Sequence, residues 1–235
     1  MPHTKRLGVV GGIGPDSTIE YYRAIIAIHR ELLPEAPDPS VLINSIDVRT
    51  LLALVGKKDF TGMVAHLRSA VDTLADGGAD FAILAAVTPH IVFDELQAVC
   101  RIPLLSIVDA TRDYAQSLAL HRVGLLGTRF TMQAPFFPAV FARSHMAIVV
   151  PRDEEQQYVH TKYVDELLKG ILLAETRNGI LDVVRQMKDR DAIDSVILGG
   201  TDLSLIIKDT ELFGLPVLDA TQIHARAAVH RLIQP

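Results

Sequence analysis

The sequence predicts an α/β fold with two pseudo-symmetric domains, each a parallel-type sheet flanked by helices, and a site in the cleft between them. The first observation behind this prediction is an internal repeat. Residues 80–90 (DFAILAAVTPH) and 194–204 (DSVILGGTDLS) each hold a short apolar run that ends in two small residues and then reaches a threonine. Two more pairs follow in the same order, GVVGGIGPDST with GLLGTRFTM and IPLLSIVDAT with LPVLDAT. The offsets of 116 (124 − 8), 114 (194 − 80) and 113 (216 − 103) indicate a repeat of whole domains rather than a solenoid period.

The second observation is that apolar runs of strand length alternate with segments of helical spacing along the chain. Alternation of this kind is typical of βαβ units, which build parallel sheets. A strand buried on both faces of such a sheet is a continuous apolar run rather than an apolar–polar alternation. Ligands of open parallel sheets bind at the carboxyl ends of the strands. The two repeated strand ends therefore predict where the site lies.

In the first half, glycine and proline mark the limits of the elements. A strand leads into the glycine-rich turn at 11–14, and the helix that follows ends before Pro34. A later helix is closed by Gly77 and Gly78, which is a common helix stop. The expected strands are 7–10, 41–46, 81–85 and 104–108, and the expected helices are 19–33, 60–75, 89–99 and 111–120, with a turn or short helix at 48–54.

The second half repeats this order of elements. Its first helix has Pro135 in the expected first turn, while Pro138 fits poorly inside a helix. The expected strands are 123–126, 147–150, 195–198 and 217–218, and the expected helices are 131–142, 154–167, 174–188 and 221–232. We expect the last helix to pack back on the first half. The predicted domains are therefore 1–112 plus 219–235 and 113–218.

Composition excludes several classes of protein. With 235 residues, 49% hydrophobic and 22% charged, the chain is apolar enough to bury a core and is not expected to be disordered. A net charge of −5 argues against nucleic acid as the main partner, since phosphate binding favours a basic surface. No run reaches the length of a membrane span, and the chain passes from MPHTKR directly into a strand without a signal peptide. We therefore expect a cytoplasmic protein with no membrane partner.

Cysteine and histidine usage argues against a metal centre. Cys100 is the single cysteine, so neither an internal disulfide nor a multi-cysteine metal site is expected. The nine histidines show no HExxH or similar ligand spacing. The sequence therefore predicts no metal site.

The turn GGIGPDST at Gly11–Thr18 is the first candidate binding element. It is not a dinucleotide fingerprint, because GxGxxG would need a further glycine where Asp16 and Ser17 stand. The turn still brings backbone N–H groups and a helix N-terminus to one point, which suits a carboxylate or a phosphate. The alternative is a tight strand-to-helix turn with Asp16 or Ser17 as its N-cap. From the residues alone, both interpretations stand.

The repeated strand ends lack a side chain that could transfer a proton. Ala86 and Gly200 stand where a substrate is expected, and neither can ionise. Thr88 and Thr201 follow them and offer hydroxyl groups, although both could simply be N-caps. The turn Gly127-Thr128-Arg129 is the counterpart of the glycine-rich turn and a second candidate anion cradle.

Charged residues near these ends are weaker candidates. Asp47 and Arg49 end a strand and could face the cleft, but charged residues at strand ends are usually solvated surface. By pattern alone, Lys162 is a solvated residue of a helix. His90 follows Pro89 near the cleft and is a capping or core residue as readily as a functional one.

Motifs along nearly the whole chain resemble the aspartate/glutamate racemase family. They are LGVVGGIGPDSTIEYYR (7–23), the strand end at Asp47, LAAVTPHIVFDELQ (84–97), IPLLSIVDAT (102–111), VGLLGTRFTM (123–132), LKGILLAETR (168–177), VILGGTDLSLII (196–207) and LPVLDATQIHARAAV (215–229).

The resemblance implies an amino-acid racemase that needs no cofactor. Members of the family move the α-proton with two residues on opposite faces of the substrate, typically two cysteines, with a threonine replacing the first in some. The family motifs Cys-Asn-Thr and Gly-Cys-Thr-Glu correspond here to Ala86-Val87-Thr88 and Gly199-Gly200-Thr201-Asp202. Both acid/base positions, Ala86 and Gly200, are therefore empty. Since a positioned general acid or base contributes about 10²–10⁴-fold, little racemase activity is expected.

The resemblance also implies which residues contact the substrate. These positions are Gly11, Gly12, Asp47, Arg49, Val87, Thr88, Thr128, Lys162, Thr201 and Asp202, with Val87 in place of an asparagine and Asp202 in place of a glutamate. The implied partner is a small amino acid or carboxylate. Dimers are common in the family, so the resemblance also allows a homodimer.

These observations predict a racemase-family protein that acts on or binds a small amino acid or dicarboxylate and whose racemase activity is in doubt. One alternative is a non-catalytic protein that binds a small carboxylate. Another is a repurposed one-base isomerase or lyase that uses His90, Asp47 or Asp202. Engineered substitutions at 86 and 200 would give the same pattern, although Val87 beside Ala86 argues against them.

Overall fold

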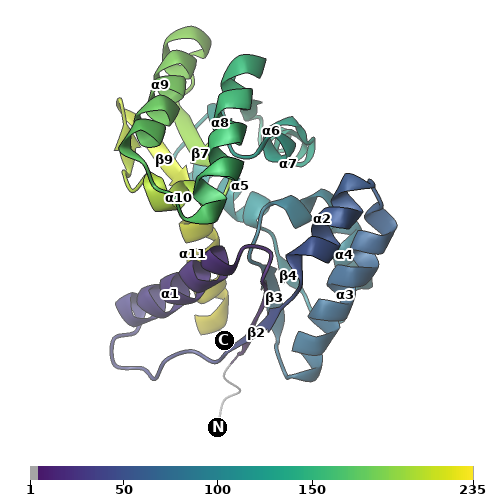
Figure 1. The fold of residues 1–235 in the computed structure, drawn as a ribbon. Coiled ribbons are helices and arrows are strands. Elements are labelled where there is room, and N and C mark those ends of the chain that lie inside the picture. The colour runs from purple at the N-terminus through teal and green to yellow at the C-terminus, as the bar shows by residue number, and fades with distance from the viewer. Residues whose placement is uncertain (1–4, 235) are drawn as a thin grey trace. The chain divides into compact units, whose positions relative to one another are not determined.

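The structure, a computed structural model, describes residues 5–234 and divides into two compact units (Figure 1). Unit 1 runs to Ile107 and resumes at His224, and unit 2 comprises Val108–Ile223. Both crossings between the units fall within helices, namely α5 (Ile107–Ser117) and α11 (Ala220–Ile233). Among residues 5–234, no helix is both long and apolar enough to cross a membrane.

Unit 1 is built on a sheet of four parallel strands in the order β2-β1-β3-β4. Besides α11 its elements are β1 (Leu7–Gly11), α1 (Pro15–Leu32), β2 (Val41–Ser45), α2 (Val48–Gly56), α3 (Phe60–Asp76), β3 (Phe81–Leu84), the 3₁₀ helix η1 (Thr88–Val92), α4 (Phe93–Val99) and β4 (Leu104–Leu105).

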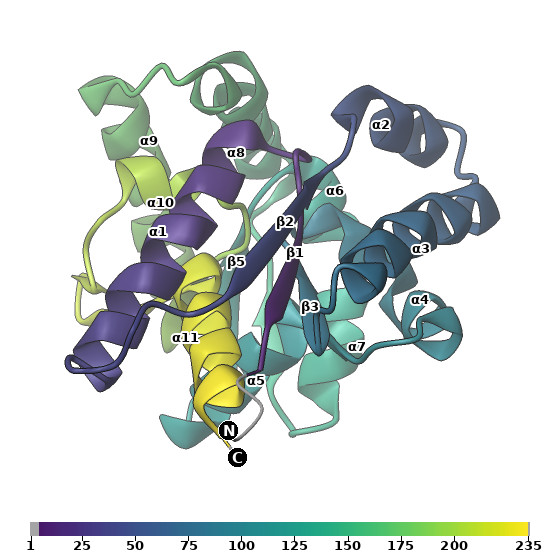
Figure 2. The same ribbon diagram turned by 90° about the horizontal axis from the view of Figure 1, so that it is seen from below.

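The two faces of this sheet bury different helices. Successive side chains of a strand point to opposite faces. Val9 and Ile83 accordingly pack with residues of α1 and α11, whereas Val10 and Leu84 pack with residues of α2, α3 and α4. In Figure 2, α1 and α11 lie side by side on one side of the strands, and α3 and α4 lie on the other. The sheet is therefore covered by helices on both faces, as the apolar strands predict.

Unit 2 holds a sheet in the order β6-β5-β7-β9-β8, in which only β8 is antiparallel to its neighbour. Besides α5 its elements are β5 (Arg122–Leu126), α6 (Arg129–Gln133), α7 (Phe136–Ala142), β6 (Ala147–Val149), α8 (Asp153–Asp165), the 3₁₀ helix η2 (Leu167–Lys169), α9 (Ala174–Asp191), β7 (Ser195–Leu198), α10 (Leu203–Ile206), β8 (Glu211–Leu212) and β9 (Leu215–Asp219).

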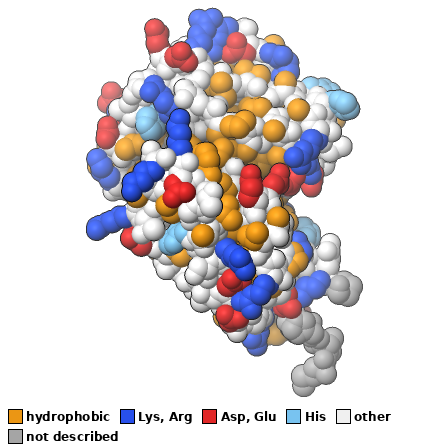
Figure 3. All heavy atoms as spheres, turned by 90° about the vertical axis from the view of Figure 1, so that its right-hand side faces the viewer, with side chains coloured by type: hydrophobic (Ala, Val, Ile, Leu, Met, Phe, Trp, Pro, Cys, Tyr) orange, Lys and Arg blue, Asp and Glu red, His pale blue; other side chains and the backbone are white. Residues whose placement is uncertain are grey.

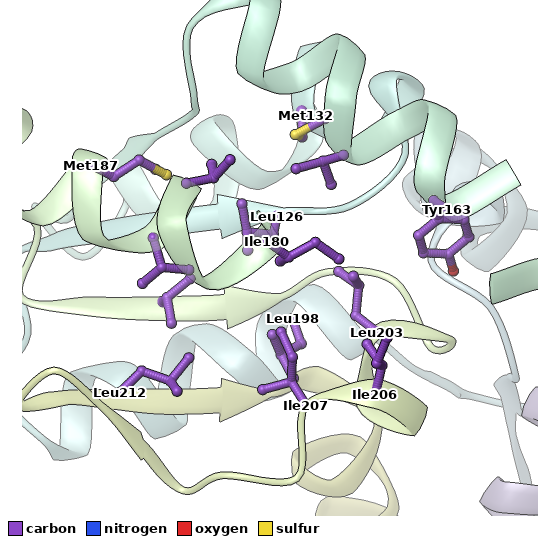
Figure 4. Close-up of a cluster of buried hydrophobic side chains, with 14 of the residues drawn as sticks. Leu126, Met132, Tyr163, Ile180, Met187, Leu198, Leu203, Ile206, Ile207 and Leu212 are labelled. Atoms are coloured by element: carbon purple, nitrogen blue, oxygen red, sulfur yellow. The ribbon is translucent and has the colours of Figure 1, made fainter. Parts of the chain in front are cut away.

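One face of this second sheet packs against α8 and α9 in a single apolar cluster. Its buried members include Leu126 and Leu198 from the strands and Ile180 from α9 (Figure 4). Tyr163 of α8 lies at one end of the cluster, with its hydroxyl oxygen pointing away from the aliphatic side chains (Figure 4). The core of unit 2 therefore ends at an aromatic residue with a polar tip.

The strand pairings confirm the internal repeat. Leu7 pairs with Phe81 and Val123 pairs with Ser195, so equivalent positions are separated by 116 (123 − 7) and 114 (195 − 81) residues. The β3–β4 and β7–β9 pairings repeat at offsets of 114 (196 − 82) and 113 (217 − 104). These are the offsets of the sequence repeat, and the strand orders 2-1-3-4 and 6-5-7-9 are equivalent. The α/β fold with two sheets flanked by helices, predicted from the sequence, is confirmed.

One predicted helix is wrong. Residues 131–142 do not form a continuous helix but two short ones, α6 and α7, which are separated at Ala134 and Pro135. Proline has no N–H to donate and disfavours helical geometry in the residue before it. Ala134 accordingly has extended angles (φ −74°, ψ 147°) and ends α6, while Pro135 is the N-cap of α7.

Two further boundaries differ from the prediction for local reasons. The strand expected at 104–108 has only two residues, because the Ile107 N–H donates to the His90 imidazole (3.2 Å) and α5 begins there. The first helix begins at Pro15 with Gly14 as its N-cap, rather than at Asp16 or Ser17. Proline suits the first helical position, since that residue has no intrahelical N–H bond to lose.

The hairpin of β8 and β9 has no counterpart in the prediction. Its two-residue connection, Phe213-Gly214, has positive φ at both positions (53° and 77°). A two-residue hairpin loop of this geometry favours Asn-Gly or Asp-Gly. The sequence Phe213-Gly214 therefore did not indicate a hairpin. The Arg185 guanidinium lies 4.7 Å from the centre of the Phe213 ring and covers it.

Charged side chains of both signs are mixed on one face of the molecule. On the face drawn in Figure 3, acidic and basic side chains are interspersed among polar and apolar ones. Several ion pairs are exposed, for example Arg30–Asp38 and Arg101–Asp76. Such pairs contribute little to stability, so each unit is stabilised mainly by its own buried apolar clusters.

Candidate functional site

The carboxyl ends of β1, β2 and β3 gather the predicted residues of unit 1. Gly11 ends β1 and pairs with Ser45, while the Ala85 N–H donates to the Val10 carbonyl (2.9 Å). The segments that follow these strands therefore lie along one edge of the sheet. We call this edge the first half-site, and its predicted residues are Gly11, Gly12, Asp47, Arg49, Ala86, Val87 and Thr88.

The glycine-rich turn is fixed by close approach of the backbone. Gly12 has φ +81°, and a Cβ atom there would lie 2.4 Å from the Ile46 carbonyl oxygen and 2.5 Å from Ser45 Oγ. The Gly12 N–H donates to Thr18 Oγ1 (3.0 Å), whose hydroxyl donates in turn to the Gly14 carbonyl (2.9 Å). This N–H, a candidate carboxylate donor, is therefore used inside the turn.

Asp47 and Arg49 are joined at the start of α2. Asp47 is the N-cap of this helix, and its carboxylate accepts from the Arg49 N–H (3.0 Å) and the Thr50 hydroxyl (3.3 Å). Both side chains are exposed. Within residues 5–234 the Arg49 guanidinium has no ion-pair partner, so its charge is available to an anion.

The segment after β3 is largely buried. Ala86 and Val87 are 9% and 5% exposed, and Thr88 is half-buried. Thr88 is the first residue of η1 and makes no side-chain capping bond, so the N-cap alternative is wrong for Thr88. Its hydroxyl group is the polar side-chain group that this strand end presents.

His90 is a structural histidine with both ring nitrogens engaged. Nε2 accepts from the Ile107 N–H (3.2 Å), so in the neutral ring Nδ1 carries the proton and donates to the Val87 carbonyl (3.2 Å). The ring stacks on Phe93 with centroids 5.2 Å apart. This arrangement leaves neither nitrogen for proton transfer to a ligand.

A second buried histidine supports the same segment. The His224 Nε2–H donates to the Leu105 carbonyl (2.9 Å), so Nδ1 accepts from the Tyr21 hydroxyl (2.9 Å). His224 is fully buried, and burial, with a smaller contribution from His90, lowers its pKa to about 3. The centroids of the His90 and His224 rings lie 6.3 Å apart, in a T-shaped arrangement. Together they hold the chain at Leu105–Ile107, where unit 1 passes into α5.

In unit 2 the carboxyl ends of β5 and β7 carry four of the remaining predicted residues, Thr128, Gly200, Thr201 and Asp202. The Gly199 N–H donates to the Leu126 carbonyl (2.7 Å), and a Cβ at Gly127 would lie 3.0 Å from the Gly199 carbonyl oxygen. These glycines let the two strand ends lie in contact. We call this edge the second half-site, and its predicted residues are Thr128, Gly200, Thr201 and Asp202. The fifth predicted residue, Lys162, lies on α8, next in the chain to Tyr163.

The proposed anion cradle at 127–129 is occupied by internal bonds. Thr128 is the N-cap of α6, and its hydroxyl accepts from the Thr131 N–H (3.2 Å). The Arg129 N–H donates to His160 Nδ1 (3.3 Å), and the Arg129 guanidinium donates to the Gln157 amide oxygen. The capping role considered for such threonines therefore describes Thr128.

Lys162 is paired within its own helix. Its Nζ lies 2.5 Å from Glu166 Oε1, and this hydrogen bond raises the Lys162 pKa. Glu166 also accepts from the Thr176 hydroxyl. In this arrangement the charge of Lys162 is balanced by Glu166, and Arg49 is the basic candidate that stays unpaired within residues 5–234.

Gly200 faces the ring of Tyr163. A Cβ at position 200 would lie 2.5 Å from Tyr163 Cε2, 2.8 Å from Oη and 3.0 Å from Cζ. The Tyr163 hydroxyl donates to Asp202 Oδ2 (2.6 Å), and the Thr201 hydroxyl lies 3.4 Å from the same oxygen. Burial and the neighbouring Asp202 raise the Tyr163 pKa well above its usual value, so the phenol is neutral. Thr201 precedes the Asp202 N-cap of α10, so the N-cap alternative is wrong for Thr201.

The two half-sites thus present hydroxyl groups, a buried carboxylate and one unpaired guanidinium, but no ionisable side chain at positions 86 and 200. Within the described residues, no group of three or more His, Cys, Asp or Glu side chains is placed to hold a metal ion. A guanidinium group such as that of Arg49 can bind a small carboxylate through two N–H groups.

Comparison with known proteins identifies the family. Residues 10–228 match the sequence profile of the family described as Asp/Glu/Hydantoin racemase. The chain belongs to this racemase family. The match includes residues of both units and of both half-sites.

Relatives of this racemase family align over nearly the full length of the chain. The broad specificity amino-acid racemase RacX of Bacillus subtilis is 23% identical over 226 residues, covering 95% of this chain and 96% of RacX. An aspartate racemase homologue from Pyrococcus horikoshii has a TM-score of 0.87 at 31% identity, covering 98% and 100% of the two chains. A Yersinia pestis protein with a provisional assignment as an Asp/Glu racemase has a TM-score of 0.90 at 30% identity, with the same coverage.

The racemase resemblance did not point to Tyr163, which belongs to the second half-site by geometry. The backbone of Gly200 lies outside the left-handed region, so glycine is not required there by its φ angle. The structure shows that Tyr163 fills the space beside Gly200, and no feature of the sequence links these two residues.

Proposed function

We propose that this racemase-family protein binds a small amino acid or dicarboxylate at the carboxyl ends of its strands and does not racemise it. The observation that carries the proposal is the pair of strand ends at Ala86 and Gly200, which occupy equivalent places in the two repeats, 114 residues apart (200 − 86), and carry no ionisable group. Racemisation needs a proton carrier on each face of the α-carbon. Losing two positioned carriers removes about 10²–10⁴-fold each.

The binding part of the proposal rests on groups placed at the carboxyl ends of the strands. The Arg49 guanidinium is exposed and can form a two-point contact with a carboxylate. Thr88 is half-buried and does not cap its helix. The amino-acid substrate class named for RacX supports the same class of ligand here.

The one-base alternative, with a proton carrier such as His90, Asp47 or Asp202, is less well supported. Both nitrogens of His90 are engaged by Val87 and Ile107. Asp47 is exposed and caps α2, and Asp202 is buried against the Tyr163 hydroxyl. Both carboxylates are thus engaged by groups of the protein itself, so we favour binding without turnover.

Two measurements test this function. Aspartate and glutamate incubated with the protein in D₂O are expected to keep their α-proton, as followed by proton NMR. The same ligands are expected to raise the melting temperature, because a ligand at about 100 times its Kd stabilises the folded state by roughly 2.7 kcal/mol. Rapid α-deuteration would contradict the loss of racemase activity, and an unchanged melting temperature with every dicarboxylate tried would contradict binding.

A matched pair of capping variants tests whether Asp47 belongs to the binding site. Asp47→Ala and Asp59→Ala each remove an N-cap carboxylate that accepts a backbone N–H, at 3.0 Å and 2.9 Å. Each is expected to cost about 1 kcal/mol of unfolding free energy. Only Asp47→Ala should also reduce stabilisation by dicarboxylates, measured as the ligand-induced shift in melting temperature. Equal shifts in the two variants would mean that Asp47 is a cap and nothing more.

A further inference from the structure

The space in front of Gly200 is already filled by another residue. The three Tyr163 atoms nearest to a Cβ at position 200 are Cε2, Oη and Cζ, all at the far end of the ring. Real Cβ atoms essentially never approach other heavy atoms to 2.5 Å, so any side chain at position 200 would have to displace this ring. The ring therefore occupies the volume that a reactive side chain at position 200 would need.

Tyr163 cannot move aside at low cost, because it is held at both ends. Its ring is part of the apolar cluster of unit 2, and the residue is 4% exposed. Its hydroxyl donates to Asp202 Oδ2 (2.6 Å), and the Asp202 N–H lies 3.4 Å from the same hydroxyl oxygen. A swing of the ring would break these contacts and leave the Asp202 carboxylate, which is only 5% exposed, without this partner.

We propose that Tyr163 is the residue that closes the carboxyl end of β7 to a proton-transferring side chain, with Gly200 as the glycine that makes room for its ring. The proposal rests on the function proposed above and extends it. In the second half-site, the volume that a side chain at position 200 would occupy is filled by the Tyr163 ring, whose hydroxyl is hydrogen-bonded to Asp202.

The proposal has a consequence for how the protein could regain activity. A cysteine placed at position 200 meets the Tyr163 ring before it can reach a substrate. Restoring Ala86→Cys and Gly200→Cys is therefore not sufficient, and the Tyr163 ring must also be shortened.

Tyr163→Leu and Tyr163→Phe form a matched pair of backgrounds for the first test. Leucine lacks Cε2, Cζ and Oη, the three atoms in conflict, whereas phenylalanine keeps two of them and loses only the hydroxyl. Gly200→Ala is expected to lower the melting temperature by on the order of 5–10 °C in the wild-type and Tyr163→Phe backgrounds, as over-packing does. In the Tyr163→Leu background it should change the melting temperature by no more than about 2 °C. An equal loss in all three backgrounds would overturn the proposal.

The second test measures whether a cysteine at position 200 can exchange the α-proton of a substrate. Ala86→Cys/Gly200→Cys and the same pair with Tyr163→Leu are compared for α-deuteration of aspartate and glutamate in D₂O. The triple variant is expected to exchange on the order of 100-fold faster, the lower range for a positioned acid or base. Equal rates in the two proteins, or an inert triple variant that aspartate still stabilises, would contradict the closing role of Tyr163.

The two tests separate this proposal from the function on which it rests. If no dicarboxylate stabilises even the wild-type protein, the binding function fails, while the dependence of Gly200→Ala on residue 163 still decides whether Tyr163 fills the space. If a cysteine variant does not fold, the alanine and leucine variants still give that answer.

Discussion

Lowering the pH from 7 to 4 is expected to reduce the unfolding free energy of unit 1 by about 3 kcal/mol through His224 alone. The side chain is fully buried, and its pKa is lowered from 6.5 to about 3. Between these two values the unfolded chain binds a proton that the folded protein does not. The contribution of neutral His224 to the unfolding free energy is therefore fully present above pH 6.5. Below that pH it falls by up to about 1.4 kcal/mol for each pH unit.

The groups around His224 explain why the charged ring is disfavoured. It meets the Tyr21 hydroxyl from α1, the Leu105 carbonyl from β4 and the edge of the His90 ring from η1. None of the three carries a negative charge that would stabilise an imidazolium. Since both crossings between the units lie beside this histidine, its protonation should loosen the chain at Leu105–Ile107 first.

Urea unfolding measured from pH 7 to pH 4 in wild type, His224→Gln and His230→Gln tests this linkage. His230 lies on the same helix and is exposed, so His230→Gln is the control for replacing a histidine of α11 at an exposed position. His224→Gln is expected to be less stable at pH 7, because glutamine cannot reproduce both bonds of the ring, and to have a shallower pH slope. A slope as steep as that of the wild type would show that His224 does not titrate as its burial requires.

The fold was predictable because its signals are local and repeated. Continuous apolar runs such as 81–84 gave the buried strands, and three repeated cues gave the equivalence of the halves. The errors occur where a single contact decides the structure. The break at Ala134 follows from one proline, and the early start of α5 follows from one bond between Ile107 and His90.

The candidate sites were predictable in position but not in detail. Strand ends can be located from sequence, because the carboxyl edge of a parallel sheet collects whatever follows each strand. The sequence does not show which polar groups already have hydrogen-bond or ion-pair partners inside the protein, because many of those partners lie far apart along the chain. Glu166 neutralises Lys162 within one helix, but Tyr163 meets Gly200 and Asp202 across 37 (200 − 163) and 39 (202 − 163) residues. No spacing rule links such positions.

Gly12→Ala is expected to destabilise the protein by on the order of 3 kcal/mol. Two causes add. The backbone has φ +81°, which an alanine adopts only with strain, and the new Cβ would lie 2.4 Å from the Ile46 carbonyl oxygen and 2.8 Å from its nitrogen. Both atoms belong to the backbone that leads from β2 to Asp47, so they cannot move aside without displacing the first half-site.

Gly56→Ala is the matched control for this substitution. Gly56 is exposed, ends α2, and has no heavy atom within 4 Å of a Cβ built on it. Alanine should leave stability unchanged or raise it by less than about 1 kcal/mol, as expected from helix propensity. Chemical denaturation of the two variants gives the comparison, and dicarboxylate-induced stabilisation of Gly12→Ala under folded conditions adds a functional readout. A Gly12→Ala protein as stable as Gly56→Ala would mean that the turn after β1 is looser than the contact with Ile46 implies, and that the first half-site is not rigidly positioned by it.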